Sequence, residues 1–142
     1  MYVGRILPSK GIHVLIRAAD QAARSIPNLK LYIIGTGKRK YIRYLRRLAA
    51  KSRANISFIA PLPRTKVHRA YWLADCIVYP SQSFEAFGLV AIEALSSRVP
   101  AIVSKNGGLR EIVKHHYNGL VVQNYSSAAA FAKPIIKLAH NR

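Results

Sequence analysis

Short apolar runs alternate with amphipathic segments along the whole chain. The apolar runs predict strands at residues 2–7, 29–34, 55–59, 76–79, 101–104 and 120–123. Apolar positions at helical spacing predict helices at residues 12–25, 38–53, 65–73, 88–97, 109–115 and 126–140. Apolar strands that alternate with helices are typical of a parallel sheet covered on both faces. The pattern therefore predicts an α/β fold with a doubly wound, Rossmann-like parallel sheet.

The length and composition predict one folded domain over residues 1–142, because 51% of the residues are hydrophobic. No apolar run approaches the roughly 20 residues of a membrane-spanning helix. The first residues lead directly into strand-like sequence, without the pattern of a signal peptide. With Cys76 as its single cysteine, the sequence excludes an intrachain disulfide and a cysteine zinc cluster. These features together predict a cytoplasmic protein.

The charge is strongly unbalanced, with 23 Lys and Arg against 5 Asp and Glu and a net charge of +18. Such a surface attracts polyanions, among them nucleotide phosphates, nucleic acid and anionic lipid head groups. Within residues 38–53, Arg39, Arg43, Arg47 and Lys51 recur every four residues and form a basic stripe. The stripe fits docking on a membrane surface, and it fits a solvated face equally well.

Ligands of doubly wound sheets bind beyond the carboxyl ends of the strands. The loops expected at that edge are residues 5–11, 35–38, 59–64, 81–88 and 104–108. Arg5 and Lys10 precede a helix start, where they form either a diphosphate site or ordinary surface cations. Residues 35–38 lack both standard phosphate-loop patterns and are interpreted as a tight turn. Two glycines in residues 104–108 allow either a close approach to a ligand or simple turn formation.

Two of the rare acidic residues, Glu85 and Glu93, lie eight positions apart at a loop-to-helix junction. At a rise of about 1.5 Å per residue they are about 12 Å apart along a helix. This reach matches the separation between the sugar and the ribose of a nucleotide-diphosphate-sugar. A carboxylate can accept hydrogen bonds from the hydroxyl groups of either one. The alternative, equally open on spacing alone, is that Glu85 faces the helix dipole while Glu93 pairs with a neighbouring arginine.

Several short motifs follow one another in a fixed order. They are Gly4-Arg5 with Lys10-Gly11, Ile34-Gly35-Thr36-Gly37, Ala74-Asp75-Cys76-Ile77-Val78-Tyr79-Pro80-Ser81, Glu85-Ala86-Phe87-Gly88-Leu89 with Glu93-Ala94, Val99-Pro100, and Gly107-Gly108-Leu109 with Glu111-Ile112-Val113. In this order and spacing the chain resembles the carboxyl-terminal, donor-binding lobe of retaining GT-B glycosyltransferases. The group it resembles is family four, also called glycosyl transferases group 1, and the resemblance covers nearly the whole chain.

The resemblance implies specific roles in the transfer of a hexose to a glycan or a lipid-linked acceptor. The implied catalytic residues are Arg5 and Lys10, which stabilise the departing diphosphate, and Glu85, which contacts the donor sugar. Glu93 is implied to hold the ribose. The remaining implied donor-binding residues are Gly4, Ser81, Phe87, Gly88 and Leu89. The resemblance implies a UDP-, GDP- or ADP-sugar donor, retention of configuration, and neither a metal nor a cofactor.

The chain also departs from the pattern of that family. Arg98 and Ala60 stand where the family commonly has glycine, and if a left-handed helix cap is needed at position 98, arginine costs about 1 kcal/mol there. The family's amino-terminal, acceptor-binding lobe is not found in the sequence. The sequence is therefore expected to be a fragment, a short reading frame, or one half of a split enzyme whose amino-terminal lobe another chain supplies. An anionic surface at the inner membrane face is a further expected partner, whereas nucleic acid is less favoured. The alternative hypothesis is a non-catalytic basic α/β module that binds nucleic acid or a partner protein.

Overall fold

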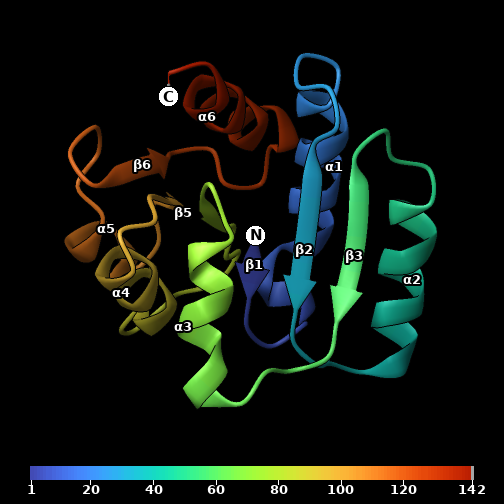
Figure 1. Ribbon diagram of the computed structural model, residues 1–142, viewed down its shortest axis with the longest axis horizontal. Coiled ribbons are helices and arrows are strands. Elements are labelled where there is room, and N and C mark those ends of the chain that lie inside the picture. Colours follow the sequence, from blue (N-terminus) through green and yellow to red (C-terminus); the bar gives the residue numbers. More distant parts are fainter. Residues whose placement is uncertain (142) are drawn as a thin grey trace.

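The computed structural model describes residues 1–141 (Figure 1). The strands are β1 (Tyr2–Val3), β2 (Lys30–Ile34), β3 (Asn55–Ile59), β4 (Ile77–Tyr79), β5 (Ala101–Ser104) and β6 (Gly119–Val122). The helices are the 3-10 helix η1 (Pro8–Lys10), α1 (Ile12–Ala22), α2 (Arg39–Ala49), α3 (Arg64–Trp72), α4 (Leu89–Ser96), α5 (Leu109–Ile112) and α6 (Ala128–His140). Every predicted strand and helix has a counterpart, and they follow one another in the predicted order.

All strand pairs are parallel and form two three-stranded sheets, ordered β1-β2-β3 and β4-β5-β6. The sheets meet at β1 and β4, where the Val78 N–H donates to the Met1 carbonyl at 2.9 Å. The strands therefore follow the spatial order β3-β2-β1-β4-β5-β6. This order is that of a doubly wound fold, which confirms the predicted fold class. Between β1 and β4 the direction of winding reverses, and such folds bind ligands at this switch point.

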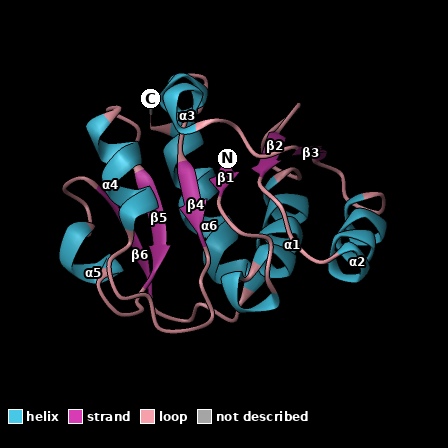
Figure 2. Ribbon diagram, turned by 90° about the horizontal axis from the view of Figure 1, so that it is seen from below, coloured by secondary structure: helices cyan, strands magenta, loops and turns pink. Residues whose placement is uncertain are grey.

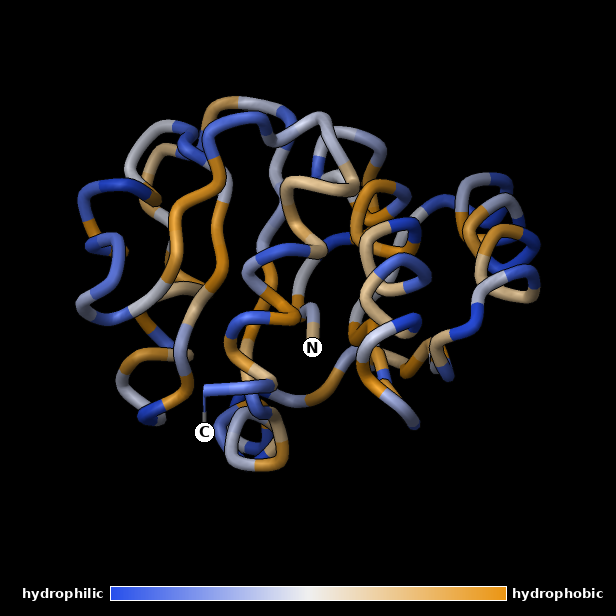
Figure 3. The backbone as a smooth tube through the Cα atoms, turned by 90° about the horizontal axis from the view of Figure 1, so that it is seen from above, coloured by the Kyte–Doolittle hydropathy of each residue, from blue (hydrophilic) through white to orange (hydrophobic). Residues whose placement is uncertain are grey.

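Two groups of helices cover the sheets. Helix α1 packs against α2 and α6, whereas α4 packs against α3 and α5. Figure 2 shows β4 and β5 between the α4–α5 pair on one side and α1 and α6 on the other. The strands, α1 and α6 supply many of the fully buried side chains, among them Tyr2, Leu15, Ile33, Ile102 and Phe131. Figure 3 shows hydrophobic stretches along the strands and hydrophilic positions on outward helix turns.

The first strand is shorter than the predicted range of residues 2–7. It ends at Val3, and the chain pairs again only where Ile6 bridges Gly37. A Cβ atom at Gly35 would lie 1.8 Å from the Gly4 carbonyl oxygen, and one at Gly37 would lie 2.0 Å from the Ile6 oxygen. The two loops thus touch backbone to backbone, which interrupts the regular ladder. Residues 35–38 are therefore not the expected tight turn but a segment that packs against the first loop.

The predicted helix over residues 109–115 forms only the single turn of α5, which ends at Ile112. The side chain of Asn118 accepts a hydrogen bond from the Lys114 N–H at 2.8 Å and donates one to the Ile112 carbonyl at 3.0 Å. These are backbone groups that a longer helix would use, so the asparagine competes with helix continuation. The longer predicted helices also end early, with α1 stopping at Ala22 and α2 at Ala49.

The predicted basic stripe lies on the outer side of α2 and just beyond it. Arg39, Arg43, Arg47 and Lys51 are all exposed. Arg46, from the same helix, lies over the Phe58 ring at 5.6 Å from the ring centroid. No helix within residues 1–141 combines the length and the apolar character needed to cross a membrane.

Candidate functional site

The loops after β1 and β4 are locked together at the switch point. Gly11, which has a φ of 70°, follows η1, and a Cβ atom there would lie 2.0 Å from the Pro80 carbonyl oxygen. The Gln82 N–H donates to the Ser9 carbonyl at 2.7 Å. Only glycine permits both the left-handed conformation and this close approach. The first loop is therefore held directly against the carboxyl end of β4.

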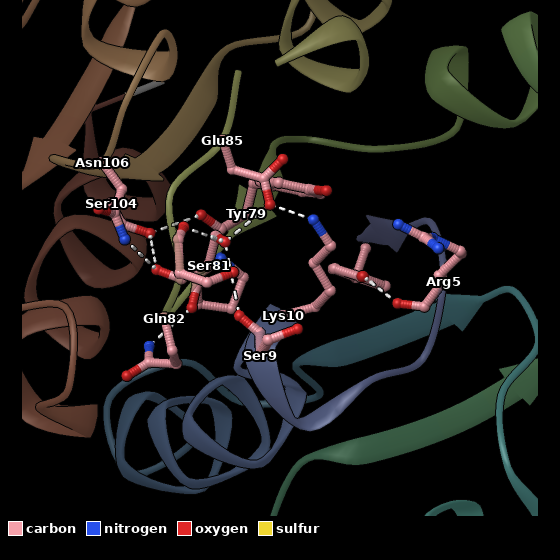
Figure 4. Close-up of polar contacts among 12 residues, drawn as sticks. Arg5, Ser9, Lys10, Tyr79, Ser81, Gln82, Glu85, Ser104 and Asn106 are labelled. Atoms are coloured by element: carbon pink, nitrogen blue, oxygen red, sulfur yellow. Dashed lines mark hydrogen bonds and ion pairs between the residues drawn. The ribbon is translucent and has the colours of Figure 1, made fainter. Parts of the chain in front are cut away.

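Lys10 and Glu85 form an ion pair across these two loops (Figure 4). They are 75 positions apart in sequence, and each side chain is only 12% exposed. The Lys10 ammonium also lies 5.6 Å from the centroid of the Tyr79 ring. In Figure 4 both charged groups point toward the centre of the site, and Arg5 lies to one side of them. The two residues predicted to contact diphosphate and sugar thus contact each other.

The ion pair keeps Lys10 charged. Burial alone would lower the pKa of Lys10, but the hydrogen bond to Glu85 and the neighbouring negative charge outweigh it, so the pKa is raised above its ordinary value of 10.5. Burial also raises the pKa of Tyr79, and the charge of Glu85 adds to this effect. At neutral pH the site therefore presents an ammonium beside a neutral phenol.

The position of Glu85 depends on the fully buried Ser81. The Ser81 hydroxyl lies 2.8 Å from Glu85 Oε1 and 3.0 Å from the Ser83 carbonyl oxygen. The Ser81 carbonyl in turn accepts hydrogen bonds from Ser104 Oγ at 2.7 Å and from Asn106 Nδ2 at 3.2 Å. The last residue of β5 and the loop after it therefore fix the backbone from which the Ser81 hydroxyl reaches Glu85 (Figure 4).

The two glycines after β5 pack against the backbone of Glu85. A Cβ atom at Gly107, where φ is 53°, would lie 2.2 Å from the Glu85 carbonyl oxygen. A Cβ atom at Gly108 would lie 2.6 Å from the Ala86 carbonyl oxygen, and the Gly108 N–H donates to the Glu85 carbonyl at 2.7 Å. The close approach that the sequence suggested is thus made to the protein's own backbone.

Glu93 belongs to a separate contact, on α4. Its Oε2 atom accepts a hydrogen bond of 2.8 Å from the Tyr71 hydroxyl, which comes from the last turn of α3. Tyr71 is fully buried, and burial raises its pKa, with the hydrogen bond to Glu93 as the next cause. The expected alternative of an arginine partner for Glu93 is therefore wrong, because the partner is a neutral tyrosine.

The beginning of α4 faces outward beside the ion pair. Gly88 caps the helix with a φ of 59°, and a Cβ atom there would lie 2.7 Å from Leu109 Cδ2. Phe87 and Leu89, on either side of it, are 75% and 61% exposed. The first amides of a helix lack intrahelical partners and attract anions. Arg5 is exposed as well, and no carboxylate within residues 1–141 forms an ion pair with it.

The arrangement suits an anionic ligand that also carries hydroxyl groups. Lys10, Arg5 and the start of α4 offer positive charge, while Glu85 and Glu93 offer acceptors. In the part of the chain that the structure describes, no three His, Cys, Asp or Glu side chains lie close enough to hold a metal ion. Gly4 differs from the other predicted binding residues, because its N–H already donates to the Ile34 carbonyl at 3.0 Å.

Sequence reasoning missed several residues that organise this site. Gln82 Nε2 bridges the carbonyls of Pro80 and Tyr125 at 2.7 and 2.6 Å. Asn106 and Tyr71 hold Ser81 and Glu93 through the contacts described above. No local pattern marks these contacts, since Tyr71 is 22 positions from its partner and Asn106 is 25. The available signal was the place of Glu93 within the apolar residues 89–95, where a carboxylate needs a polar partner.

The comparison with known protein families covers the whole chain. Residues 1–142 match the family described as glycosyl transferases group 1. The putative glycosyltransferase YtcC of Bacillus subtilis is 33% identical over 141 residues, a match that covers 95% of this chain and 35% of that protein. The chain spans about a third of the length of such curated relatives.

Solved structures agree with this fold. The C-terminal domain of a glycosyl transferase group 1 family protein (LpcC) from Francisella tularensis is 25% identical, with a TM-score of 0.81. That match covers 98% of this chain and 73% of the other. Anabaena Alr3699/HepE, crystallised with UDP-glucose, is 24% identical with a TM-score of 0.87, and the match covers 98% of this chain and 38% of that one. The chain thus belongs to the glycosyl transferases group 1 family, and its fold is that of the carboxyl-terminal lobe of GT-B glycosyltransferases.

Proposed function

We propose that this domain binds the nucleotide-diphosphate-sugar donor of a retaining, metal-independent glycosyltransferase. In this proposal Arg5 and Lys10 hold the diphosphate, Glu93 accepts hydrogen bonds from the ribose, and Glu85 contacts the transferred hexose. The remaining donor contacts come from Ser81 and from the Phe87–Leu89 segment at the start of α4. The family match supports a glycosyltransferase, and the geometry supports this placement of the donor.

The observation that carries the proposal is the partly buried Lys10–Glu85 ion pair at the switch point. A cation and a carboxylate held side by side match the junction of a donor, where the anionic diphosphate meets the sugar hydroxyls. The hydrogen-bonded loops hold both groups in place before any ligand arrives. Such preorganised charge stabilises a departing diphosphate without rearrangement, as a metal ion does in other enzymes.

The acceptor site is proposed to lie outside this domain. The relatives are about three times as long as the chain, so most of their length has no counterpart here. We place the acceptor, a glycan or a lipid-linked molecule, on an amino-terminal lobe that this domain must meet for transfer. The exposed Phe87 and Leu89 side chains border the donor site and are available for such a contact.

Isothermal titration calorimetry with UDP-glucose, a GDP-sugar and an ADP-sugar tests the proposal. We expect binding of one donor, weakened by about tenfold or more in Arg5→Ala and in Glu93→Ala, because each removes a charge-assisted hydrogen bond. Arg17→Ala and Glu111→Ala are matched controls, since both residues are exposed and lie on other elements. Absence of binding to all three donors contradicts the proposal.

The exposed stripe on α2 favours a second candidate, a non-catalytic module that binds nucleic acid or a partner protein. Its affinity for nucleic acid would fall steeply with salt, since contacts to phosphates release counterions. Arg43→Glu with Arg47→Glu would abolish such binding and leave donor binding unchanged. Salt-dependent binding to RNA or DNA without donor binding would establish this candidate in place of the first.

A further inference from the structure

Tyr71 and Glu93 form a contact between two helices for which the functional roles proposed so far give no reason. Tyr71 lies in the last turn of α3 and is 0% exposed, and its hydroxyl donates to Glu93 Oε2 at 2.8 Å. Glu93 lies on α4 between the buried residues Ala91 and Ala94. Since α4 is otherwise rich in apolar side chains, the tyrosine supplies the hydrogen-bond donor that this partly buried carboxylate needs.

The neutral character of the partner matters in a chain with a net charge of +18. Lys10–Glu85 and Arg53–Asp20 are ion pairs, whereas the hydrogen bond to the Glu93 carboxylate comes from the Tyr71 hydroxyl and not from one of the many cations. A cation would neutralise the carboxylate and compete for its oxygens. Burial and the hydrogen bond to Glu93 raise the pKa of Tyr71, so the hydroxyl remains a donor at physiological pH.

The hydrogen bond also restricts the orientation of the carboxylate. A carboxylate has two oxygens and about four acceptor positions. Tyr71 engages Oε2 alone, which limits rotation of the group and leaves Oε1 with its acceptor capacity. An oxygen held in one orientation can accept hydrogen bonds from the two adjacent hydroxyl groups of a ribose. A freely rotating carboxylate would lose conformational entropy when it bound them.

We propose that Tyr71 is a positioning residue that orients Glu93 toward the ribose hydroxyls of the donor nucleotide. This inference rests on the proposed function, because it assumes that Glu93 meets the ribose. It adds a prediction that the function alone does not make. The preference for ribose over deoxyribose should depend on a residue that does not touch the ligand.

The test compares a nucleoside diphosphate with its 2′-deoxy counterpart, using the base that the wild-type domain prefers. Calorimetry gives the ratio of the two affinities for the wild type and for Tyr71→Phe, which removes only the hydroxyl. We expect the variant to lose preference for ribose by roughly five- to tenfold, with little change in affinity for the deoxy ligand. Tyr41→Phe is the matched control, because its hydroxyl bonds His13 at 3.0 Å on another pair of helices.

The double variant Tyr71→Phe with Glu93→Ala separates positioning from other effects. If Tyr71 acts through Glu93, the tyrosine substitution leaves the ratio unchanged once Glu93 is alanine. An unchanged ratio in Tyr71→Phe alone, even with a lower melting temperature, overturns the inference and leaves the proposed function standing. If Tyr71→Phe still lowers the ratio when Glu93 is already alanine, the inference is overturned as well. Failure of the wild type to bind any nucleoside diphosphate overturns the proposed function and this inference with it.

Discussion

Lys10 and Glu85 neutralise each other at the centre of the candidate donor site. Their elements reach the site from opposite sides of the switch point, η1 following β1 and the Glu85 loop following β4. A bound donor would bring a diphosphate to the ammonium and hydroxyl groups to the carboxylate. The ion pair thus holds both side chains in the positions that a donor would require, and it must share or exchange these contacts when the donor binds.

Replacing Glu85 with glutamine tests this competition. The amide keeps an acceptor oxygen for Ser81 but removes the charge that faces Lys10. We expect binding of the sugar nucleotide to weaken by about tenfold relative to binding of the bare nucleoside diphosphate, which should be unchanged or stronger. Glu111→Gln, on the exposed side of α5, is the charge-matched control. Equal weakening of both ligands would show that Glu85 has no role specific to the sugar.

Replacing Gly107 with alanine should disturb the loop that supports Glu85. The new Cβ atom would lie 2.2 Å from the Glu85 carbonyl oxygen at a position where φ is 53°. We expect the free energy of unfolding to fall by about 2 kcal/mol or more, from steric overlap and backbone strain together. Urea denaturation measures the loss. Ala129→Gly, at an exposed position in α6, serves as a mild control with an expected loss of about 1 kcal/mol. A loss at Gly107 no larger than that of the control would contradict the packing described above.

Replacing Arg98 with glycine should stabilise the protein by about 1 kcal/mol, because Arg98 occupies a left-handed position after α4 with a φ of 61°. The Arg98 N–H donates to the Leu95 carbonyl at 2.9 Å and the Val99 N–H to the Ala94 carbonyl at 3.0 Å, which is the Schellman pattern of a helix end. Arg47→Gly inside α2 removes the same charge and should instead destabilise by about 1 kcal/mol. Urea denaturation measures the free energy of unfolding of both variants. A loss of stability in Arg98→Gly would refute the prediction.

Stability should decline at alkaline pH. Burial raises the pKa of Tyr2 and Tyr71 above the ordinary value of 10, and it raises the pKa of Tyr41 to about 12. The pKa of Lys10 is raised as well. Between pH 10 and about pH 12 the folded state then binds more protons than the unfolded state, so the free energy of unfolding decreases as the pH rises.

Denaturant titrations across that pH range, with the ultraviolet absorbance of tyrosinate as a second signal, measure the effect. Buried tyrosines should ionise only as the protein unfolds. In Tyr41→Phe the free energy of unfolding should decrease less steeply with pH than in the wild type. Substitution of the exposed Tyr117 should leave this dependence unchanged. Stability that is constant or rising through this range would contradict the burial of these hydroxyl groups.

The order of strands and helices was predictable because each apolar run is short and each helix has its own local periodicity. Boundaries were less accurate where side chains or loops from elsewhere intervene. The Asn118 side chain ends α5 early, and the contact between the first two loops shortens β1. The loop contact joins groups that meet only in the folded chain, whereas the Asn118 side chain reaches back only four to six positions and ends the helix through local competition that hydrophobic periodicity does not reveal.

The sequence by itself determined the fold class, the edge of the sheet where a ligand should bind, and the scarcity of acids that distinguishes Glu85 and Glu93. Only the tertiary structure decided their partners, which are Lys10 for Glu85 and Tyr71 for Glu93. Periodicity and turn residues act over a few positions and can be read along the chain. Ion pairs and hydrogen bonds across 75 and 22 positions form only when packing brings distant loops and helices together.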